Sequence, residues 1–209
     1  MNGEAVILFV IKLVALGFSI ILHEIAHGYA AYRMGDPTAA HSNRLTLNPL
    51  AHIDLFGSII LPVILIVTGS PVLLGWAKPV PINPYYFRNL KQGIMITGAA
   101  GPLTNFLLAL ASGIVFHLVS PFSDVLAWFL AYFCATNVAL GVFNLIPIPP
   151  LDGSRVLYGL LPRGLDDRYI AIERYGMFIL FALLWVGVLD RIIYPVSMFI
   201  LRLLLGGHV

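Results

Sequence analysis

Long stretches of apolar sequence constrain the fold of this chain more than any other feature. Residues 5–32, 93–119 and 125–145 are mostly apolar, and each stretch is long enough for a helix that crosses the roughly 30 Å hydrocarbon layer of a membrane, which takes about 20 residues. Charged residues make up only 11% of the chain, against about a quarter in soluble domains. We therefore expect these three stretches to be transmembrane helices.

The two segments between the first and second of these helices contain many glycines and prolines and are not expected to form plain helices. Residues 55–75 are uncharged and apolar but are interrupted repeatedly by glycine and proline, which weakens a prediction of a plain helix. Residues 76–86, with prolines at 79, 81 and 84, indicate extended backbone of the edge-strand or polyproline kind. We expect the first segment to be re-entrant and the second to be extended.

The C-terminal part is predicted to begin with a charged loop over 165–174. The apolar stretch 175–205 is divided at 190–191 and at Pro195, which predicts two helices, or one membrane span and an interfacial helix. The expected fold is thus an all-α polytopic membrane protein. It has a three-helix core, a re-entrant and extended segment, and two C-terminal hydrophobic helices, about five to six membrane segments in all. We expect a membrane-embedded core over 1–160 and a C-terminal part over 161–209.

The basic residues predict how the chain is oriented in the membrane. Five Lys and Arg lie in 33–91 and four in 155–174, whereas the connection 120–124 has none. The positive-inside rule places the two basic regions on the cytoplasmic side. This requires 55–75 to enter and leave the membrane on one side, and it brings the end of the first helix and the end of the third to the same face.

Two classes of protein are disfavoured by composition. The net charge is only +2, and the basic residues form no run or stripe of the kind that binds nucleic acid. Cys134 is the single cysteine, so the chain forms no internal disulfide and no thiolate metal cluster.

The first apolar stretch carries the motif HEIAH at residues 23–27. A spacing of four residues places both imidazoles on one face of a helix, where they can bind one Zn²⁺. Glu24 then lies beside the metal and is free to act as a general base on a zinc-activated water. The alternative is packed polar side chains, but ionisable groups inside a membrane cost at least about 2.5 kcal/mol each and call for a compensating partner.

A catalytic zinc takes three protein ligands and keeps one position for water. Asp152 is the best candidate for the third ligand, because it follows the proline-broken end of the third helix and precedes a turn glycine. The alternative is that Asp152 caps the helix that starts near Ser154.

The motifs HEIAH, AAGPLTN at 99–105 and NLIPIPPLDG at 144–153 resemble, in order and membrane setting, those of the site-2 protease family of intramembrane metalloproteases. NPLAHID at 48–54 and GWAKPVPINP at 75–84 look like its small subgroup without a PDZ domain. The resemblance covers residues 5 to about 160. A departure is Ser154, where the family usually has a second glycine.

By motif position, the resemblance implies one Zn²⁺ per chain held by His23, His27 and Asp152, with Glu24 as general base. It also implies Asn144 as an aid to substrate or oxyanion binding, which an amide can provide. Asn105 is a weaker candidate, because a membrane asparagine also commonly ties helices together. A metal role for His52, in a polar loop, is the least favoured of these assignments.

The expected substrate is a membrane protein or a signal-peptide-like segment, and the expected location is the cell membrane, with the active site toward the cytoplasm. Because a transmembrane helix hides its peptide bonds, it must unwind before cleavage, and the extended stretch 76–86 can pair with it by strand addition. A metal-binding transporter, a catalytically silent scaffold and a protease of soluble peptides remain alternatives.

Overall fold

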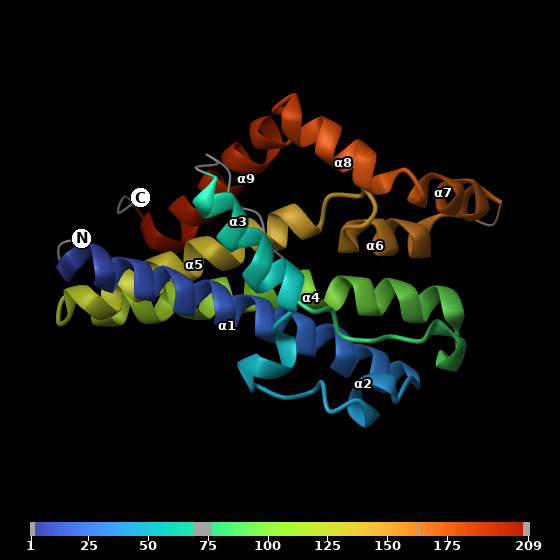
Figure 1. Cartoon of the computed structure of the whole chain (residues 1–209), viewed down its shortest axis with the longest axis horizontal. Coiled ribbons are helices and arrows are strands. Elements are labelled where there is room, and N and C mark those ends of the chain that lie inside the picture. The colour runs from blue at the N-terminus through green and yellow to red at the C-terminus, as the bar shows by residue number, and fades with distance from the viewer. Residues whose placement is uncertain (1–2, 69–76, 163, 207–209) are drawn as a thin grey trace.

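The computed structural model describes residues 3–68, 77–162 and 164–206, and this part of the chain is mostly helical and contains no strand (Figure 1). The helices are α1 (Gly3–Met34), α2 (Thr38–His41), α3 (Leu61–Val67), α4 (Leu90–Val119), α5 (Asp124–Asn144), α6 (Asp152–Leu160), α7 (Leu165–Glu173), α8 (Gly176–Trp185) and α9 (Val188–Leu205). Short 3₁₀ turns lie at Pro49–His52 and Pro84–Tyr86, and a π-helical turn at Leu55–Ile60 precedes α3.

Three long helices form the core. Helices α1, α4 and α5 pack on one another, and all three are long and apolar enough to cross a membrane. Small or polar side chains fill the space between them, including Ala15, Ala109 and Cys134, all fully buried, and such residues let membrane helices approach closely. Large apolar side chains such as Phe9, Leu13 and Leu107 face outward, which suits contact with lipid. The predicted all-α membrane fold is confirmed.

The long connection between α1 and α4 returns to the end of the bundle from which it leaves. The Arg88 N–H donates to the Met34 carbonyl over 3.3 Å, and the Asn83 N–H donates to Asp36 Oδ2 over 2.7 Å. The C-terminal end of α1 and the N-terminal end of α4 therefore lie together, which excludes a single full crossing by residues 35–89.

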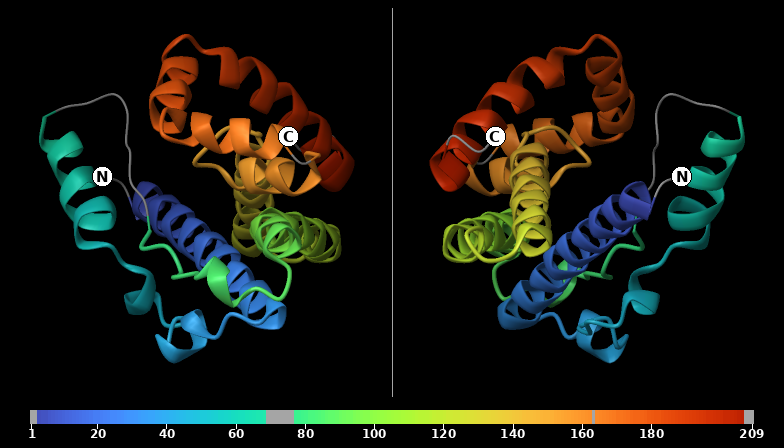
Figure 2. Two further views of the ribbon diagram at one scale, coloured as in Figure 1. Left: turned by 90° about the vertical axis from the view of Figure 1, so that its right-hand side faces the viewer. Right: turned by 90° about the vertical axis from the view of Figure 1, so that its left-hand side faces the viewer.

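The predicted re-entrant segment is described only in part. Residues 55–67 form the π-helical turn and α3, which stands apart from α1 in both views of Figure 2. Residues 69–75 lie outside the described part of the chain, so re-entry into the membrane remains a prediction.

Residues 77–83 are irregular and contain no strand, because their hydrogen bonds go to side chains and loops and not to a neighbouring strand. Of the two predicted kinds of extended backbone, the edge strand is therefore absent from these residues. The C-terminal part departs from the predictions in two places. The predicted loop 165–174 is mostly α7. The apolar C-terminal stretch divides at Gly187, whose φ of 72° is left-handed, while Pro195 lies inside α9.

Together α6, α7, α8 and α9 form an arch on one side of the core (Figures 1 and 2). Helix α6 packs on α4, and α9 packs on α5. The arch begins at Asp152, the first residue of α6, so it starts where the functional site lies.

Candidate metal centre and active site

Two helices from distant parts of the sequence bring three ligand-type side chains together. His23 and His27 lie one turn apart on α1, and Asp152 begins α6. The Nε2 atoms of the two histidines are 2.9 Å apart, and Asp152 Oδ2 lies 3.1 Å from each of them. All three residues are buried, and they form the one His/Cys/Asp/Glu group with metal-ligand spacing among the described residues. We call these three residues the metal-type cluster.

The hydrogen-bond partners of the two imidazoles determine which ring nitrogen carries the hydrogen. His23 Nδ1 is 2.6 Å from the side-chain oxygen of Asn105, and His27 Nδ1 is 2.7 Å from the carbonyl oxygen of Thr97. Both oxygens can only accept, so each Nδ1 carries the hydrogen and each neutral ring presents a lone pair at Nε2. Two nitrogen lone pairs and a carboxylate then converge, and they require a proton or a cation between them.

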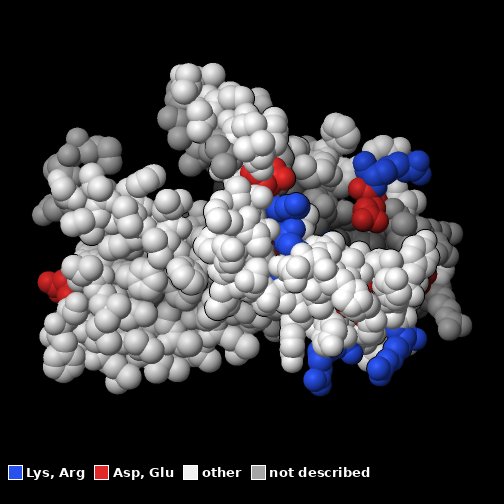
Figure 3. Space-filling view, turned by 60° about the horizontal axis from the view of Figure 1, so that its bottom comes forward, with Lys and Arg blue, Asp and Glu red and all other residues white. Residues whose placement is uncertain are grey.

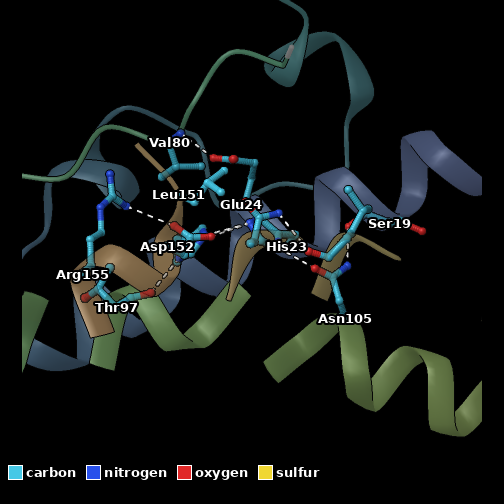
Figure 4. Close-up of polar contacts among 12 residues, drawn as sticks. Ser19, His23, Glu24, Val80, Thr97, Asn105, Leu151, Asp152 and Arg155 are labelled. Atoms are coloured by element: carbon cyan, nitrogen blue, oxygen red, sulfur yellow. Dashed lines mark hydrogen bonds and ion pairs between the residues drawn. The ribbon is translucent and has the colours of Figure 1, made fainter. Parts of the chain in front are cut away.

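The connection from α5 to α6 sets the direction of the carboxylate. Gly153 packs so closely on the end of α5 that an added Cβ would lie 2.2 Å from the Leu145 carbonyl oxygen. Asp152 makes no cap hydrogen bond; the N-cap is Leu151, so the capping interpretation is wrong. The Asp152 Oδ1 atom lies 3.5 Å from Nη1 of Arg155, while Oδ2 faces the imidazoles (Figure 4).

The charge of the Asp152 carboxyl follows from these neighbours. Burial raises the pKa of this carboxyl. In the metal-free cluster, where protons take the place of a cation, the hydrogen bonds and charge of the protonated imidazoles lower it by more, so the net pKa is below its ordinary value. The group is therefore ionised at neutral pH, as a metal ligand must be.

Gly101 on α4 leaves the space in front of the imidazoles open. A Cβ at this position would lie 2.4 Å from His27 Nε2 and 2.5 Å from His23 Cε1. Only glycine permits this approach, so the AAGPLTN motif provides one wall of the cluster in addition to the amide of Asn105.

Glu24 is held beside the cluster by the backbone of the irregular segment. The Val80 N–H donates to Glu24 Oε2 over 2.8 Å (Figure 4). Val80 is flanked by Pro79 and Pro81, which have no N–H, so it supplies the single backbone donor of this Pro-Val-Pro run. The hydrogen bond fixes one carboxylate oxygen of Glu24.

The structure does not bring every sequence candidate to the cluster. Asn144 ends α5 and donates through Nδ2 to the Leu140 carbonyl over 3.1 Å. His52 is buried, and its Nε2 donates to the Thr46 carbonyl over 2.8 Å, so it anchors a loop. Neither belongs to the metal-type cluster. Asn105, in contrast, contacts His23 directly.

Sequence reasoning missed three contributors. Thr97 acts through its carbonyl oxygen, and Val80 through its N–H, and backbone groups leave no mark in residue type. Asn137 on α5 contacts Asn105; a polar residue within an apolar helix was the available signal.

Comparison with known proteins decides what kind of centre this is. A Bacillus subtilis protein named "Putative zinc metalloprotease YwhC" is 38% identical over 181 residues, which cover 83% of this chain and 78% of the relative. The family model "Peptidase family M50" matches residues 120–187. The chain belongs to peptidase family M50. A second M50 relative, "Putative zinc metalloprotease Rip2" of Mycolicibacterium smegmatis, is 31% identical over 188 residues, which cover 88% of this chain and 70% of the relative. No solved structure gives a significant match.

Membership in M50 makes the chain a zinc metalloprotease and favours an enzyme over a transporter or scaffold. The cluster fits the metal. Two ligands about 2.0–2.1 Å from a tetrahedral zinc are about 3.3 Å apart, and the ligand atoms here are separated by 2.9 to 3.1 Å. Small side-chain shifts bring the three atoms to that spacing, and two nitrogens with one carboxylate oxygen are a ligand set that catalytic zinc uses.

Proposed function

We propose that the chain hydrolyses peptide bonds of membrane-spanning substrates, with zinc held by His23, His27 and Asp152. The observation that carries this proposal is the buried convergence of three acceptor atoms within 3.1 Å of one another, in a core of helices that can cross a membrane. Zinc in this position supplies Lewis acidity, which lowers the pKa of water at its open position to about 7.

Glu24 is the proposed general base. Its Oε2 is held by the Val80 N–H, so the remaining oxygen can take a proton from the attacking water and return it to the leaving amine. The carboxylate is thereby oriented before substrate arrives.

Asn144 is the proposed aid to substrate or oxyanion binding. Its amide donates to its own helix at Leu140, so this role requires the side chain to leave that carbonyl and turn toward the bound peptide. Its place at the end of α5, directly before the connection to Asp152, supports the proposal.

A cavity of about 630 Å³ adjoins the cluster and is the proposed site for substrate side chains. Thr97 and Ser154, neighbours of the cluster, line it together with Ile94, Tyr158 and Tyr169. The Thr97 hydroxyl is buried without a hydrogen-bond partner in the described structure, and a polar group of a bound peptide would satisfy it. Such a cavity suits a locally unwound segment with aliphatic or aromatic side chains.

The irregular segment 77–83 is the proposed edge beside which the substrate lies. Three of its backbone donors are already used. The Lys78 N–H donates to the His52 carbonyl over 2.9 Å, the Val80 N–H to Glu24, and the Asn83 N–H to Asp36. Strand addition would therefore rely on the remaining backbone groups of this segment.

The proposed location is the cell membrane, with the site toward the cytoplasm. On the face shown in Figure 3, Lys and Arg gather toward the end that carries the site, and the opposite end is white apart from one acidic group. This distribution agrees with the positive-inside rule.

The test compares wild type, Glu24→Gln and the control Asp124→Asn, whose carboxylate lies at the far end of α5. Each is purified in detergent and given a single-span model substrate and a soluble peptide of the same cleavage region. We expect about one zinc in each protein, cleavage of the membrane substrate by wild type and control, and a loss of about 10²-fold or more in Glu24→Gln. Equal cleavage by Glu24→Gln would refute the base, and cleavage of the soluble peptide alone would refute the substrate class.

A further inference from the structure

A chain of buried amides leads away from the metal-type cluster into the middle of the three-helix core. Asn105 on α4 accepts from His23 Nδ1 over 2.6 Å and donates to Asn137 Oδ1 on α5 over 2.8 Å. Asn137 donates in turn to Ser19 Oγ on α1, 2.8 Å away, and to the Phe133 carbonyl oxygen, 2.9 Å away. Asn105, Asn137 and Ser19 are each fully buried.

The far end of this chain can only accept. The Phe133 carbonyl has no hydrogen, and the Ser19 hydroxyl already donates its hydrogen to the Ala15 carbonyl over 2.8 Å. Asn137 must therefore turn its NH₂ toward them and its oxygen toward Asn105. Asn105 must then turn its NH₂ toward Asn137 and its oxygen toward His23.

The opposite orientation of Asn105 is costly. It would set the Asn105 oxygen against the Asn137 oxygen and against the Ser19 carbonyl, which lies 3.5 Å from Asn105 Nδ2. Buried polar atoms without a partner cost about 1–3 kcal/mol each. His23 would then have to accept at Nδ1 and carry its hydrogen at Nε2, the atom that faces the metal.

The two histidines differ in the kind of group that accepts their Nδ1 hydrogen. His27 donates to the backbone carbonyl of Thr97, which cannot exchange its oxygen for a donor. His23 donates to the side-chain amide of Asn105, which can do so by rotating its oxygen and NH₂ into each other's place. His23 therefore needs a second residue to set the orientation of the first, and Asn137 occupies that place.

We propose that Asn137 is a positioning residue of the zinc site: it orients the Asn105 amide, which keeps the hydrogen of His23 on Nδ1 and leaves Nε2 free to bind metal. This rests on the proposed zinc site and adds a residue of α5 to it. In the described part of the chain Asn137 forms no hydrogen bond with His23, His27 or Asp152, so its effect passes through Asn105.

The test is a double-mutant cycle on zinc affinity, measured by chelator competition on metal-stripped protein in detergent. Asn137→Leu removes the orienting groups but keeps the branched shape and the number of side-chain heavy atoms. We expect zinc to bind roughly 10-fold to 100-fold more weakly, as for other groups that orient metal ligands. Asn105→Asp supplies a carboxylate, which has only acceptor atoms and presents one to His23 in either orientation. In this background Asn137→Leu should weaken zinc binding by less than about twofold.

Controls separate positioning from packing. The double variant contains the same leucine, so a packing defect would weaken zinc binding in both backgrounds and overturn the proposal. Ser112→Ala removes a buried hydroxyl of α4 that donates to the Ala109 carbonyl of its own helix and also contacts Cys134 on α5. Neither partner belongs to the amide chain, and we expect this variant to bind zinc like wild type. The Co²⁺ absorption spectrum of each loaded variant reports whether the ligand set is retained.

If Asn137→Leu does not fold, Ser19→Ala removes one acceptor of the Asn137 NH₂ and should lower zinc affinity only when residue 105 is asparagine. Unchanged affinity in both Asn137→Leu and Ser19→Ala overturns the positioning role while leaving the zinc site intact. Failure of wild type to bind zinc overturns both the site and this inference.

Discussion

At the scale of single residues, the site depends on groups that contribute no ligand atom. Gly101 leaves room in front of the imidazoles, Asn105 and Thr97 fix the Nδ1 hydrogens, and Val80 fixes Glu24. The three ligand-type side chains were predictable. HEIAH marks the two histidines, and the resemblance of NLIPIPPLDG to the site-2 protease motif singled out Asp152, whose position alone also fitted a helix cap. The residues that hold these side chains in place were less predictable. Thr97 and Val80 act through backbone atoms, and the role of Gly101 depends on which helix lies opposite it.

The Gly101→Ala substitution tests the open wall of the cluster. The added methyl would lie 2.4 Å from His27 Nε2, so the imidazoles must shift, and a misplacement of about 1 Å can cost about 100-fold in rate. We expect that loss in cleavage, with weaker zinc binding. Gly17→Ala on α1 is the matched control, because a Cβ there meets nothing within 4 Å. Similar activity in both variants would show that the approach of α4 is unimportant.

At the scale of elements, the periodic and apolar segments were predictable and the irregular ones were not. The three core helices lie within a few residues of their predicted bounds, since a long apolar run in a membrane satisfies its backbone hydrogen bonds by forming a helix. Helix α7 was predicted as a loop because it is charged; it is stabilised by tertiary contacts such as the 2.9 Å ion pair between Lys91 and Asp166. Extended backbone of the edge-strand or polyproline kind was predicted over 76–86. Of these two, the edge strand is not found in the described residues 77–86, because their donors bind Glu24, His52 and Asp36 instead.

The Val80→Pro substitution tests whether the irregular segment positions the base. Proline removes the N–H that donates to Glu24 Oε2 while fitting the extended backbone before Pro81. A hydrogen bond to a charged group contributes about 1.5–3 kcal/mol, so we expect kcat to fall about 10-fold or more with zinc content unchanged.

Val80→Ala keeps the N–H and loses only the side chain, which makes it the control for Val80→Pro. We expect it to retain most of the wild-type kcat. A kcat that falls equally in both variants would mean that packing of the buried Val80 side chain matters and the hydrogen bond does not.

At the scale of the whole molecule, the arrangement of α1, α4 and α5 brings the metal-type cluster to one end of the bundle. The connection after α1 returns to its starting point through Arg88 and Asn83, and α5 ends beside Asp152. Charge counting predicted that these ends share a side, and their contact in the structure agrees. Which side of the membrane they occupy is a separate prediction.

Thiol labelling tests this orientation in a Cys134→Ser background, because Cys134 is the only native cysteine. The variants Ser42→Cys, in the exposed residue that follows α2 in the α1–α4 connection, and Phe122→Cys, in the exposed α4–α5 connection, are treated in intact cells with a membrane-impermeant reagent. We expect labelling of position 122 in intact cells and of position 42 only after permeabilisation. The reverse pattern would mean that the protein has the opposite orientation in the membrane. Equal labelling of both positions in intact cells would contradict the three-helix topology.

Zinc-edge X-ray absorption on the purified protein tests most directly whether His23, His27 and Asp152 hold one zinc ion. We expect about one zinc per chain with imidazole nitrogens and oxygens at about 2.0–2.2 Å, and imidazole scattering that is lower in His27→Ala. A sulfur ligand at about 2.3 Å, a shell of oxygens without imidazole, or a purified active protein without zinc would contradict it.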